Sequence, residues 1–371
     1  MRGTERVWAE LAPAALLYNV AQLRSRLSPG CRIIAVVKAD AYGHGGIQTA
    51  RWLSRFGVTD FAVASCREGI DLRRGGVGGR VLMLCPTPPE EAELLARHRL
   101  TQALPSIEYA VSLNRRGIPL ETELIVDTGM HRLGEDYREA DRLHRMAALP
   151  HLTVTGTFTH LGQGGDPAVS REQLRRFASA VDTLRGRGVN PGRLHVQNSA
   201  GVWSLPGLSL DAVRVGMALY GVRDRLSEWE QPGGPRLRPV LSLKTRVIQV
   251  RRVEPGEPVG YGGGNAVASP RTAAVLSAGF ADGVPRQLAR GGLVLINGRR
   301  CPVIGVCMDM TIADVTAVSP PVRPGGVATF IGGDGEAFLP AEALAEAAGT
   351  VTSDILCGLS SRVERRWLPL D

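Results

Sequence analysis

The chain has 371 residues, 44% of them hydrophobic and 22% charged, which is typical of a globular protein long enough for one large domain and a smaller one. Its net charge of +8 is spread over helix-like segments in which arginines alternate with acidic residues, so we expect solvated helix faces or a small anionic ligand, and no nucleic-acid partner. We see no charged leader and no apolar run of ~18 residues, so we expect a soluble cytoplasmic protein without membrane contact. The six cysteines contain no C-x-x-C pair, so we expect reduced thiols and no metal site.

From residue 10 to about residue 220, short β-rich runs alternate with amphipathic helical patterns. The candidate strands are 31–38, 60–65, 80–84, 101–105, 121–129, 151–160, 193–199 and 211–216. The helices predicted between them include 86–98, 106–116, 135–148 and 170–187. Several strands are apolar nearly throughout, as parallel strands buried on both faces are. Eight such units predict an α/β fold, with a (β/α)8 TIM-type barrel over residues 10–232; an open doubly wound sheet is the alternative.

The pattern changes after a segment rich in proline and glycine at residues 230–240. Short strands with tight turns follow, at 241–253, 272–279, 293–305, 311–318 and 327–333. The dipeptide Asn297-Gly298 is typical of a two-residue hairpin turn. With one further helix near 340–348, these signals predict a mainly β C-terminal domain over residues 233–371.

Polar residues gather where the predicted barrel strands end, which is where TIM-barrel enzymes carry their chemistry. In chain order these residues are Lys38, Arg132, His160, Asn198, Ser199 and Arg214. Phosphate sites of such barrels are commonly built after the last two strands from backbone amides. Ser199 and the amides of Gly216 and Met217 are suitably placed, so we expect a phosphorylated ligand that faces the lysine.

Lys38 is one of only two lysines in a chain with 44 basic residues; the other is Lys244. A Schiff base with a carbonyl compound requires an amine that can lose its proton, which a desolvated lysine does readily and an arginine does not. This contrast favours carbonyl chemistry at Lys38. The alternative is a surface lysine paired with Asp40, and composition and placement leave both interpretations open.

The segment AVVKADAYGHG, residues 35–45, resembles the pyridoxal-phosphate lysine segment of the alanine racemase family. The segments DTGMHRLG, FTHL, NSAG, VRVGMALYG, VGYGGG, GFADGVPR and VCMDM resemble further parts of that family in the same order. The resemblance implies a fold-type III enzyme with pyridoxal 5'-phosphate as its cofactor. It also implies a homodimer with shared active sites that interconverts L-alanine and D-alanine and supplies D-alanine for peptidoglycan, with residues 1–9 packing on the β domain.

The resemblance further implies two proton-transferring groups. Racemisation requires two, because the α-proton must leave one face of the substrate and return on the other. Lys38 resembles the lysine on one face, and Tyr261 resembles the tyrosine that the partner subunit contributes on the other. Tyr261 is also the only tyrosine after Tyr220. His160 and Arg214 resemble the pair that forms a hydrogen-bonded path toward that tyrosine.

Arg214 also resembles the arginine that faces the pyridine nitrogen of the cofactor. Arg132 resembles the arginine that contacts the phenolic oxygen of the cofactor and the carboxylate of the substrate. Met308, again from the partner, resembles the residue whose backbone binds that carboxylate. The residues that resemble ligands or lining of the phosphate site are Tyr42, Asn198, Ser199, Gly216 and Met217.

Some positions depart from the family pattern and leave the substrate open. Ile125 stands where the family often has a carbamylated lysine that positions the arginine corresponding to Arg132. Phe280 and Ser353 stand where tyrosines are usual. Phe280 removes one hydroxyl at the entrance, and Ser353 leaves room for a larger or hydroxylated side chain of the substrate. The alternatives are therefore a serine or broad-specificity amino-acid racemase, a decarboxylase on the same two-domain plan, and a non-catalytic protein that carries pyridoxal phosphate.

Overall fold

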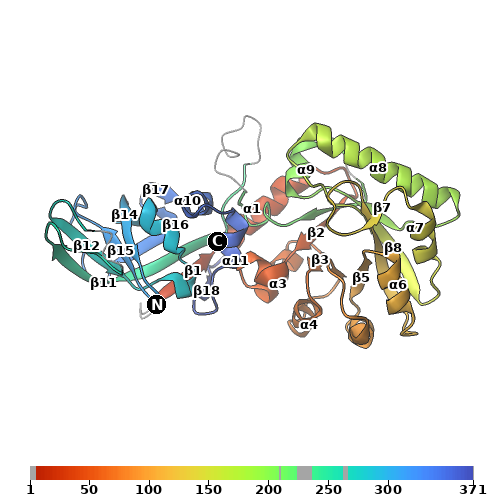
Figure 1. Ribbon diagram of the computed structural model, residues 1–371, viewed down its shortest axis with the longest axis horizontal. Helices are drawn as coiled ribbons and strands as arrows, with labels where there is room; N and C mark the ends of the chain where they lie inside the picture. Colours follow the sequence, from red (N-terminus) through yellow and green to blue (C-terminus); the bar gives the residue numbers. More distant parts are fainter. Residues whose placement is uncertain (1–5, 209, 224–235, 262–265, 371) are drawn as a thin grey trace. The chain divides into compact units, whose positions relative to one another are not determined.

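The computed structural model describes residues 6–208, 210–223, 236–261 and 266–370. The chain forms two compact units (Figure 1). The barrel unit comprises residues 20–41 and 45–219, and the β unit comprises residues 1–19, 42–44 and 220–371. Among the described residues, no helix combines the length and the apolar character needed to span a membrane.

Eight parallel strands close the barrel unit, which confirms the predicted TIM-type barrel and rules out the open sheet. They hydrogen-bond in the order β2-β3-β4-β5-β6-β8-β9-β10, and β10 pairs back onto β2. Their bounds are Arg32–Val36 (β2), Asp60–Val63 (β3), Arg80–Met83 (β4), Thr101–Leu104 (β5), Leu120–Asp127 (β6), Leu152–Phe158 (β8), Arg193–His195 (β9) and Ala212–Val215 (β10). Each strand overlaps one predicted strand. A two-residue strand, β7 (Glu135–Asp136), pairs with the end of β6.

Helices surround these strands (Figure 1). Their bounds are Lys38–Tyr42 (α2), Gly46–Arg55 (α3), Cys66–Arg74 (α4), Pro89–Glu91 (η1), Ala92–Arg97 (α5), Ile107–Asn114 (α6), Ala140–Ala147 (α7), Pro167–Gly186 (α8) and Ser199–Ser204 (α9); α1 (Pro13–Arg24) precedes β2. The predicted helix at 135–148 begins later than expected, because residues 135–136 form β7 instead. The helix predicted at 170–187 begins earlier, because the Asp166 side chain accepts hydrogen bonds from the first-turn amides and Pro167 suits the first helical position.

The β unit is built on a nine-stranded sheet in the order β17-β16-β13-β14-β15-β12-β11-β1-β18, and β16 also pairs with β11. The bounds are Val7–Leu11 (β1), Leu241–Val253 (β11), Arg271–Leu276 (β12), Leu293–Ile296 (β13), Arg299–Val306 (β14), Thr311–Asp314 (β15), Val327–Asp334 (β16), Ala337–Leu339 (β17) and Glu364–Trp367 (β18). Short helices accompany it: η3 (Phe280–Asp282), η4 (Arg286–Arg290), α10 (Ala341–Ala348) and α11 (Thr352–Cys357). The mainly β character of this region is confirmed, while α11 was not predicted.

Asn297 and Gly298 form the predicted hairpin turn between β13 and β14. Both residues have positive φ, 51° and 72°, which is the geometry that makes this dipeptide favourable in two-residue hairpins. The predicted domain boundary between residues 232 and 233 lies outside the described residues and stays a prediction. So does the packing of residues 1–9 as a segment, although β1 itself pairs with β11 and β18.

Candidate active site

Most of the predicted site residues belong to the barrel unit, where they lie at or just beyond the carboxyl ends of the strands. Lys38 follows β2, Arg132 follows β6 and His160 follows β8. Asn198 and Ser199 follow β9, Arg214 lies in β10, and Gly216 and Met217 follow β10. Because the carboxyl ends of parallel strands meet at one end of a barrel, these residues share that end. Tyr42, Tyr261 and Met308 belong to the β unit.

Lys38 begins a left-handed turn, α2. The four residues that follow it, Ala39–Tyr42, have φ between 51° and 55°, although none of them is glycine. A left-handed conformation costs roughly 1–2 kcal/mol for each such residue, so surrounding contacts must hold the turn in place. Asp40 Oδ1 accepts a hydrogen bond from the Gly46 amide at 2.6 Å, and Glu68 Oε1 accepts one from the Ala39 amide at 2.7 Å. Strained backbone of this kind clusters at functional sites.

Arg214 is buried, and its terminal N–H groups are all used inside the barrel. Nη1 donates to Nδ1 and to the carbonyl oxygen of His195, at 2.8 and 3.1 Å. Nη2 donates to the Thr159 carbonyl oxygen at 2.7 Å and to Nδ1 of His160 at 3.2 Å. A guanidinium has five N–H groups. Among the described contacts, Nε–H is therefore the one donor of Arg214 left for a ligand.

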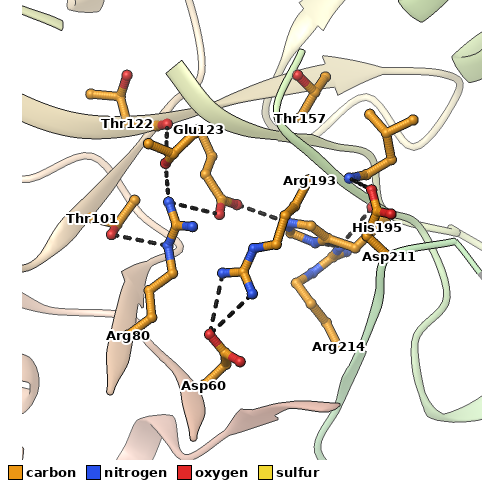
Figure 2. A network of polar contacts seen from close by, with 12 residues as sticks. Asp60, Arg80, Thr101, Thr122, Glu123, Thr157, Arg193, His195, Asp211 and Arg214 are labelled. Atoms are coloured by element: carbon orange, nitrogen blue, oxygen red, sulfur yellow. Dashed lines mark hydrogen bonds and ion pairs between the residues drawn. The ribbon is translucent and has the colours of Figure 1, made fainter. Parts of the chain in front are cut away.

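His195 and Glu123 continue this polar chain into the barrel (Figure 2). Nε2 of His195 lies 2.8 Å from Oε2 of Glu123, and neither residue is accessible to solvent. Burial lowers the pKa of His195, so the ring is neutral. We therefore assign its proton to Nε2, facing the carboxylate, which leaves Nδ1 free to accept from Arg214. Gly156 on β8 makes room for this contact, because a Cβ there would lie 2.8 Å from the Glu123 carboxylate.

The amino-terminal end of the barrel interior holds further paired charges (Figure 2). Arg193 donates to Oδ1 of Asp60 at 3.1 and 3.2 Å, and Nη2 of Arg80 lies 3.5 Å from Oε1 of Glu123. Burial opposes ionisation of Glu123, but His195, Arg80 and Arg193 outweigh it and lower the carboxyl pKa. The Glu123 carboxylate, which contacts His195 and through it Arg214, is thus kept charged.

His160 is neutral as well. Burial lowers its pKa to about 3, and the positive charges of Arg214, Arg132 and Lys38 contribute in the same direction. Because Nδ1 accepts from Arg214, the proton of the neutral ring belongs on Nε2. His160 can therefore present one N–H donor to a group on its other side.

Two cationic side chains at this end of the barrel have no ion-pair partner among the described residues. Lys38 and Arg132 form no hydrogen bond or ion pair with any described residue. Ile125, at the position where the family often has a carbamylated lysine, is buried and adds no charge. Pyridoxal phosphate brings an anionic phosphate and a phenolic oxygen, and an amino acid brings a carboxylate. The residues present therefore fit this cofactor and substrate class.

The predicted phosphate site has suitable donors. Oγ of Ser199 accepts from the amides of Gly216 and Ala218, each at 3.2 Å, so its own hydroxyl hydrogen can point elsewhere. The Met217 amide between them forms no hydrogen bond within the described residues. Asn198 has a structural task, since its Oδ1 caps α9 through the Gly201 amide and its Nδ2 donates to the Leu161 carbonyl oxygen.

In the β unit, the predicted partner-contributed residues lie on the surface. Tyr261 is 85% exposed and Met308 is 56% exposed. Phe280 and Met310 are exposed too, and the backbone of residues 280–281 hydrogen-bonds to that of residues 307–308. Tyr42 packs its ring on Tyr220, with ring centroids 5.2 Å apart. The exposed side chains of Phe280 and Met308, which the backbone bonds between residues 280–281 and 307–308 bring together, are typical of an interaction surface.

Sequence reasoning missed three residues that support this site. His195 was given no role, and Glu123 and Glu68 were not singled out at all. The available signal was weak: His195 and Glu123 are polar residues inside predicted barrel strands, where apolar residues are usual. Their partners could not be identified from spacing, because each lies on a different strand.

Comparisons with known proteins agree with this architecture. Residues 11–224 match the alanine racemase N-terminal domain, and residues 240–367 match the alanine racemase C-terminal domain. An alanine racemase from Symbiobacterium thermophilum is 38% identical over 98% of this chain and 97% of that protein. An amino-acid racemase from Enterococcus faecalis is 35% identical over 98% of this chain, which spans only 51% of that longer protein.

Solved structures give the same result. The alanine racemase from Bacillus anthracis, with bound L-Ala-P, has a TM-score of 0.92 at 28% identity, over 100% of this chain and 96% of that one. The alanine racemase from Streptomyces coelicolor has a TM-score of 0.86 at 32% identity, with 98% of both chains covered. The chain therefore belongs to the alanine racemase family of enzymes.

Proposed function

We propose that this enzyme interconverts L-alanine and D-alanine by a two-base mechanism with pyridoxal 5'-phosphate as cofactor. The observation that carries the proposal is the group of cations at the carboxyl end of the barrel. Lys38 and Arg132 have no partner among the described residues, and Arg214 has one donor left. The near full-length similarity to proteins named alanine racemase supports alanine as the substrate.

In this proposal Lys38 holds the cofactor through its side-chain amine. The phosphate is bound by the Ser199 hydroxyl and the Met217 amide, with Tyr42 and Asn198 completing the lining. The Gly216 amide, which donates to Oγ of Ser199, can serve the phosphate only by shifting from that oxygen. When bound, the cofactor supplies an aldehyde that condenses with amines and a conjugated ring that makes the α C–H of an amino acid acidic.

Arg214 faces the ring nitrogen through Nε–H. Burial lowers the pKa of Arg214 to about 10, which still leaves the guanidinium protonated at neutral pH. It therefore donates a hydrogen bond to the nitrogen without giving up the proton. By keeping its proton, Arg214 would limit the electron-withdrawing power of a bound cofactor, which would favour return of the proton to the substrate over side reactions.

Lys38 and Tyr261 act as the two bases. The Lys38 amine removes or returns the α-proton on one face, and the phenol of Tyr261 of the partner subunit does so on the other. A phenol needs a neighbouring hydrogen-bond donor to act as a base at neutral pH. We assign this help to His160, whose Nε2–H donates toward the phenolic oxygen and stabilises its ionised form.

Arg132 binds the substrate carboxylate, assisted by the backbone amide of Met308 of the partner subunit. The proposal therefore includes a homodimer in which each active site uses residues of both chains. The exposure of Tyr261, Met308, Met310 and Phe280 on the β unit supports such an interface. We further propose a cytoplasmic location, for which six cysteines that form no disulfide are typical, and a role in supplying D-alanine for peptidoglycan.

The test is to incubate the purified protein with L-alanine and with D-alanine and to follow optical rotation. Racemisation from both sides to an equal mixture is expected, with exchange of the α-hydrogen for solvent deuterium. The proposal is wrong if neither enantiomer is converted in the presence of added pyridoxal phosphate. Growth of a D-alanine-requiring bacterium that carries this chain would test the cell-wall role.

A serine or broad-specificity racemase is the second candidate. Ser353 lies on α11 and is only partly buried, and Phe280 is exposed without a hydroxyl group. Both are smaller or less polar than the tyrosines usual at these positions. L-Serine racemised at a rate comparable to L-alanine would favour this candidate, and release of carbon dioxide from either would point to a decarboxylase instead.

A further inference from the structure

The left-handed turn after Lys38 is held by a side chain from the next strand–helix unit. Glu68 lies in the first turn of α4, which follows β3, and β3 is the neighbour of β2 in the barrel. Oε1 of Glu68 accepts a hydrogen bond from the Ala39 amide at 2.7 Å. That amide belongs to the peptide bond between Lys38 and Ala39. The contact therefore fixes the peptide plane directly attached to the Cα atom of Lys38.

The second oxygen of the same carboxylate is also occupied. Oε2 of Glu68 accepts from the amides of Ala64 at 2.8 Å and Ser65 at 3.1 Å, while the Glu68 amide donates to Oγ of Ser65. The pair of contacts between Ser65 and Glu68 is a capping box that starts α4. One carboxylate thus fastens the turn after β2 to the turn after β3.

Only a carboxylate can make all of these contacts. Three backbone N–H groups point at its two oxygens, and both oxygens must accept. A glutamine would place an N–H₂ group against at least one of the backbone donors, because its amide has a single oxygen. The capping box alone would tolerate glutamine, which is a usual residue at that position. The requirement for a charged group therefore comes from the Ala39 contact in addition to the cap.

The other contacts of the turn do not replace this one. Asp40 Oδ1 accepts from the Gly46 amide, and the Asp40 carbonyl oxygen accepts from the Gly45 amide at 2.9 Å. The Ala41 amide also donates to the Val37 carbonyl oxygen at 2.9 Å, across Lys38. None of these bonds engages the Ala39 amide, which Glu68 alone accepts from among the described contacts. Without Glu68, the peptide that follows Lys38 would lose its one described hydrogen-bond acceptor and could turn toward the right-handed region, which L-residues prefer.

We propose that Glu68 is a positioning residue that directs the Lys38 side chain into the site by holding the Lys38–Ala39 peptide. It acts through the backbone and is not assigned any contact with cofactor or substrate. The inference rests on the proposed function, because it assumes that Lys38 carries the chemistry. A displacement of about 1 Å at a reacting group can lower a rate by about 100-fold, so loss of Glu68 should reduce turnover more than substrate binding.

The experiment compares Glu68→Gln with Ser65→Ala. Both variants damage the capping box of α4, but only Glu68→Gln disturbs the Ala39 contact, so Ser65→Ala is the matched control. Expected for Glu68→Gln is a loss in kcat of at least about 10-fold, with KM for alanine changed by less than about 3-fold. Ser65→Ala should keep both constants within about 2-fold of wild type, and the two variants should have similar melting temperatures.

Two further readouts do not depend on racemisation. Amide hydrogen exchange measured by mass spectrometry should become at least about 10-fold faster in residues 37–46 of Glu68→Gln, but not of Ser65→Ala, because one variant alone frees the Ala39 amide. At limiting pyridoxal phosphate, borohydride should trap several-fold less cofactor on Lys38 in Glu68→Gln than in Ser65→Ala.

Equal exchange, trapping and turnover in the two variants would overturn the positioning role while leaving the proposed function intact. Conversely, a wild-type protein that racemises nothing would overturn the proposed function. The exchange and trapping measurements would in that case still decide whether Glu68 holds and directs Lys38.

Discussion

The two ends of the barrel interior differ in how their charges are satisfied. At the amino-terminal end, Asp60, Arg80 and Arg193 are the first residues of their strands. Asp60 pairs with Arg193, and Arg80 pairs with Glu123 of β6 (Figure 2). At the carboxyl-terminal end, Lys38 and Arg132 have no described partner, and His160 between the cations is neutral. Buried charges are tolerated when they are paired. Arg132 is exposed and Lys38 is partly buried, so water can solvate these cations and they stay available to a ligand, whereas the paired charges at the other end are already satisfied by one another.

The largest expected effect comes from changing the chemistry of the unpaired end without changing its charge. Lys38→Arg keeps the cation but removes an amine that can lose its proton. We expect racemase activity to fall at least about 1,000-fold, together with loss of any borohydride-trapped cofactor. The control is Lys244→Arg, which alters the only other lysine, one paired with Glu10 at 2.6 Å in the β unit. Activity retained by Lys38→Arg would contradict the assignment.

Removing a charge from the paired end should cost stability. Glu123→Gln removes the carboxylate that pairs with Arg80 and contacts His195, and breaking a buried pair in this way costs about 3–5 kcal/mol. The measurement is the free energy of unfolding in urea. Glu121→Gln is the matched control, since Glu121 lies 3.8 Å from Arg80 but its side chain is 65% exposed, and its loss should cost less than about 1 kcal/mol. Equal losses in both variants would remove the distinction between buried and exposed carboxylates.

The neutral His160 predicts a pH dependence of stability. Its pKa in the folded protein, about 3, lies below the ordinary value of 6.5, so its contribution is fully present above pH 6.5 and is lost as the pH falls toward 3. One such group can contribute a slope of up to about 1.4 kcal/mol per pH unit. His160→Asn keeps an acceptor near Nδ1 and removes the titration. Urea unfolding between pH 6.5 and 4 should therefore show a shallower slope in the variant; an unchanged slope would mean that His160 is already charged in the folded protein.

The smallest effect tests whether the unpaired end binds anions by itself. Inorganic phosphate should raise the melting temperature of the cofactor-free protein by a few degrees, because a ligand at 100 times its Kd adds about 2.7 kcal/mol of stability. Ser199→Ala and Arg132→Ala should reduce this shift. Arg138→Ala is the control, since Arg138 is an exposed arginine already paired with Asp136 at 2.6 Å. The same shift in all variants would indicate a general salt effect.

Much of the fold could be predicted from local patterns. Several barrel strands read as short apolar runs, because parallel strands are covered on both faces, and all eight predictions overlap an observed strand. The hairpin at Asn297-Gly298 was predictable because its backbone conformation depends on those two residues alone. Helix ends were less accurate. The start of α7 depends on β7, because residues 135–136 pair with the end of β6 and are not available to the helix.

In the candidate site too, some features could be predicted from the sequence and others could not. The positions of Lys38, His160 and Ser199 at strand ends follow from the chain order, so the sequence by itself determined which residues reach the carboxyl end of the barrel. The partners of these residues did not follow. Glu68 holds Ala39 across 29 positions in the chain, and Glu123 contacts His195 across 72. Only closure of the barrel decided which charges pair and which stay available, because electrostatic energy depends on distance in space and not on separation along the chain.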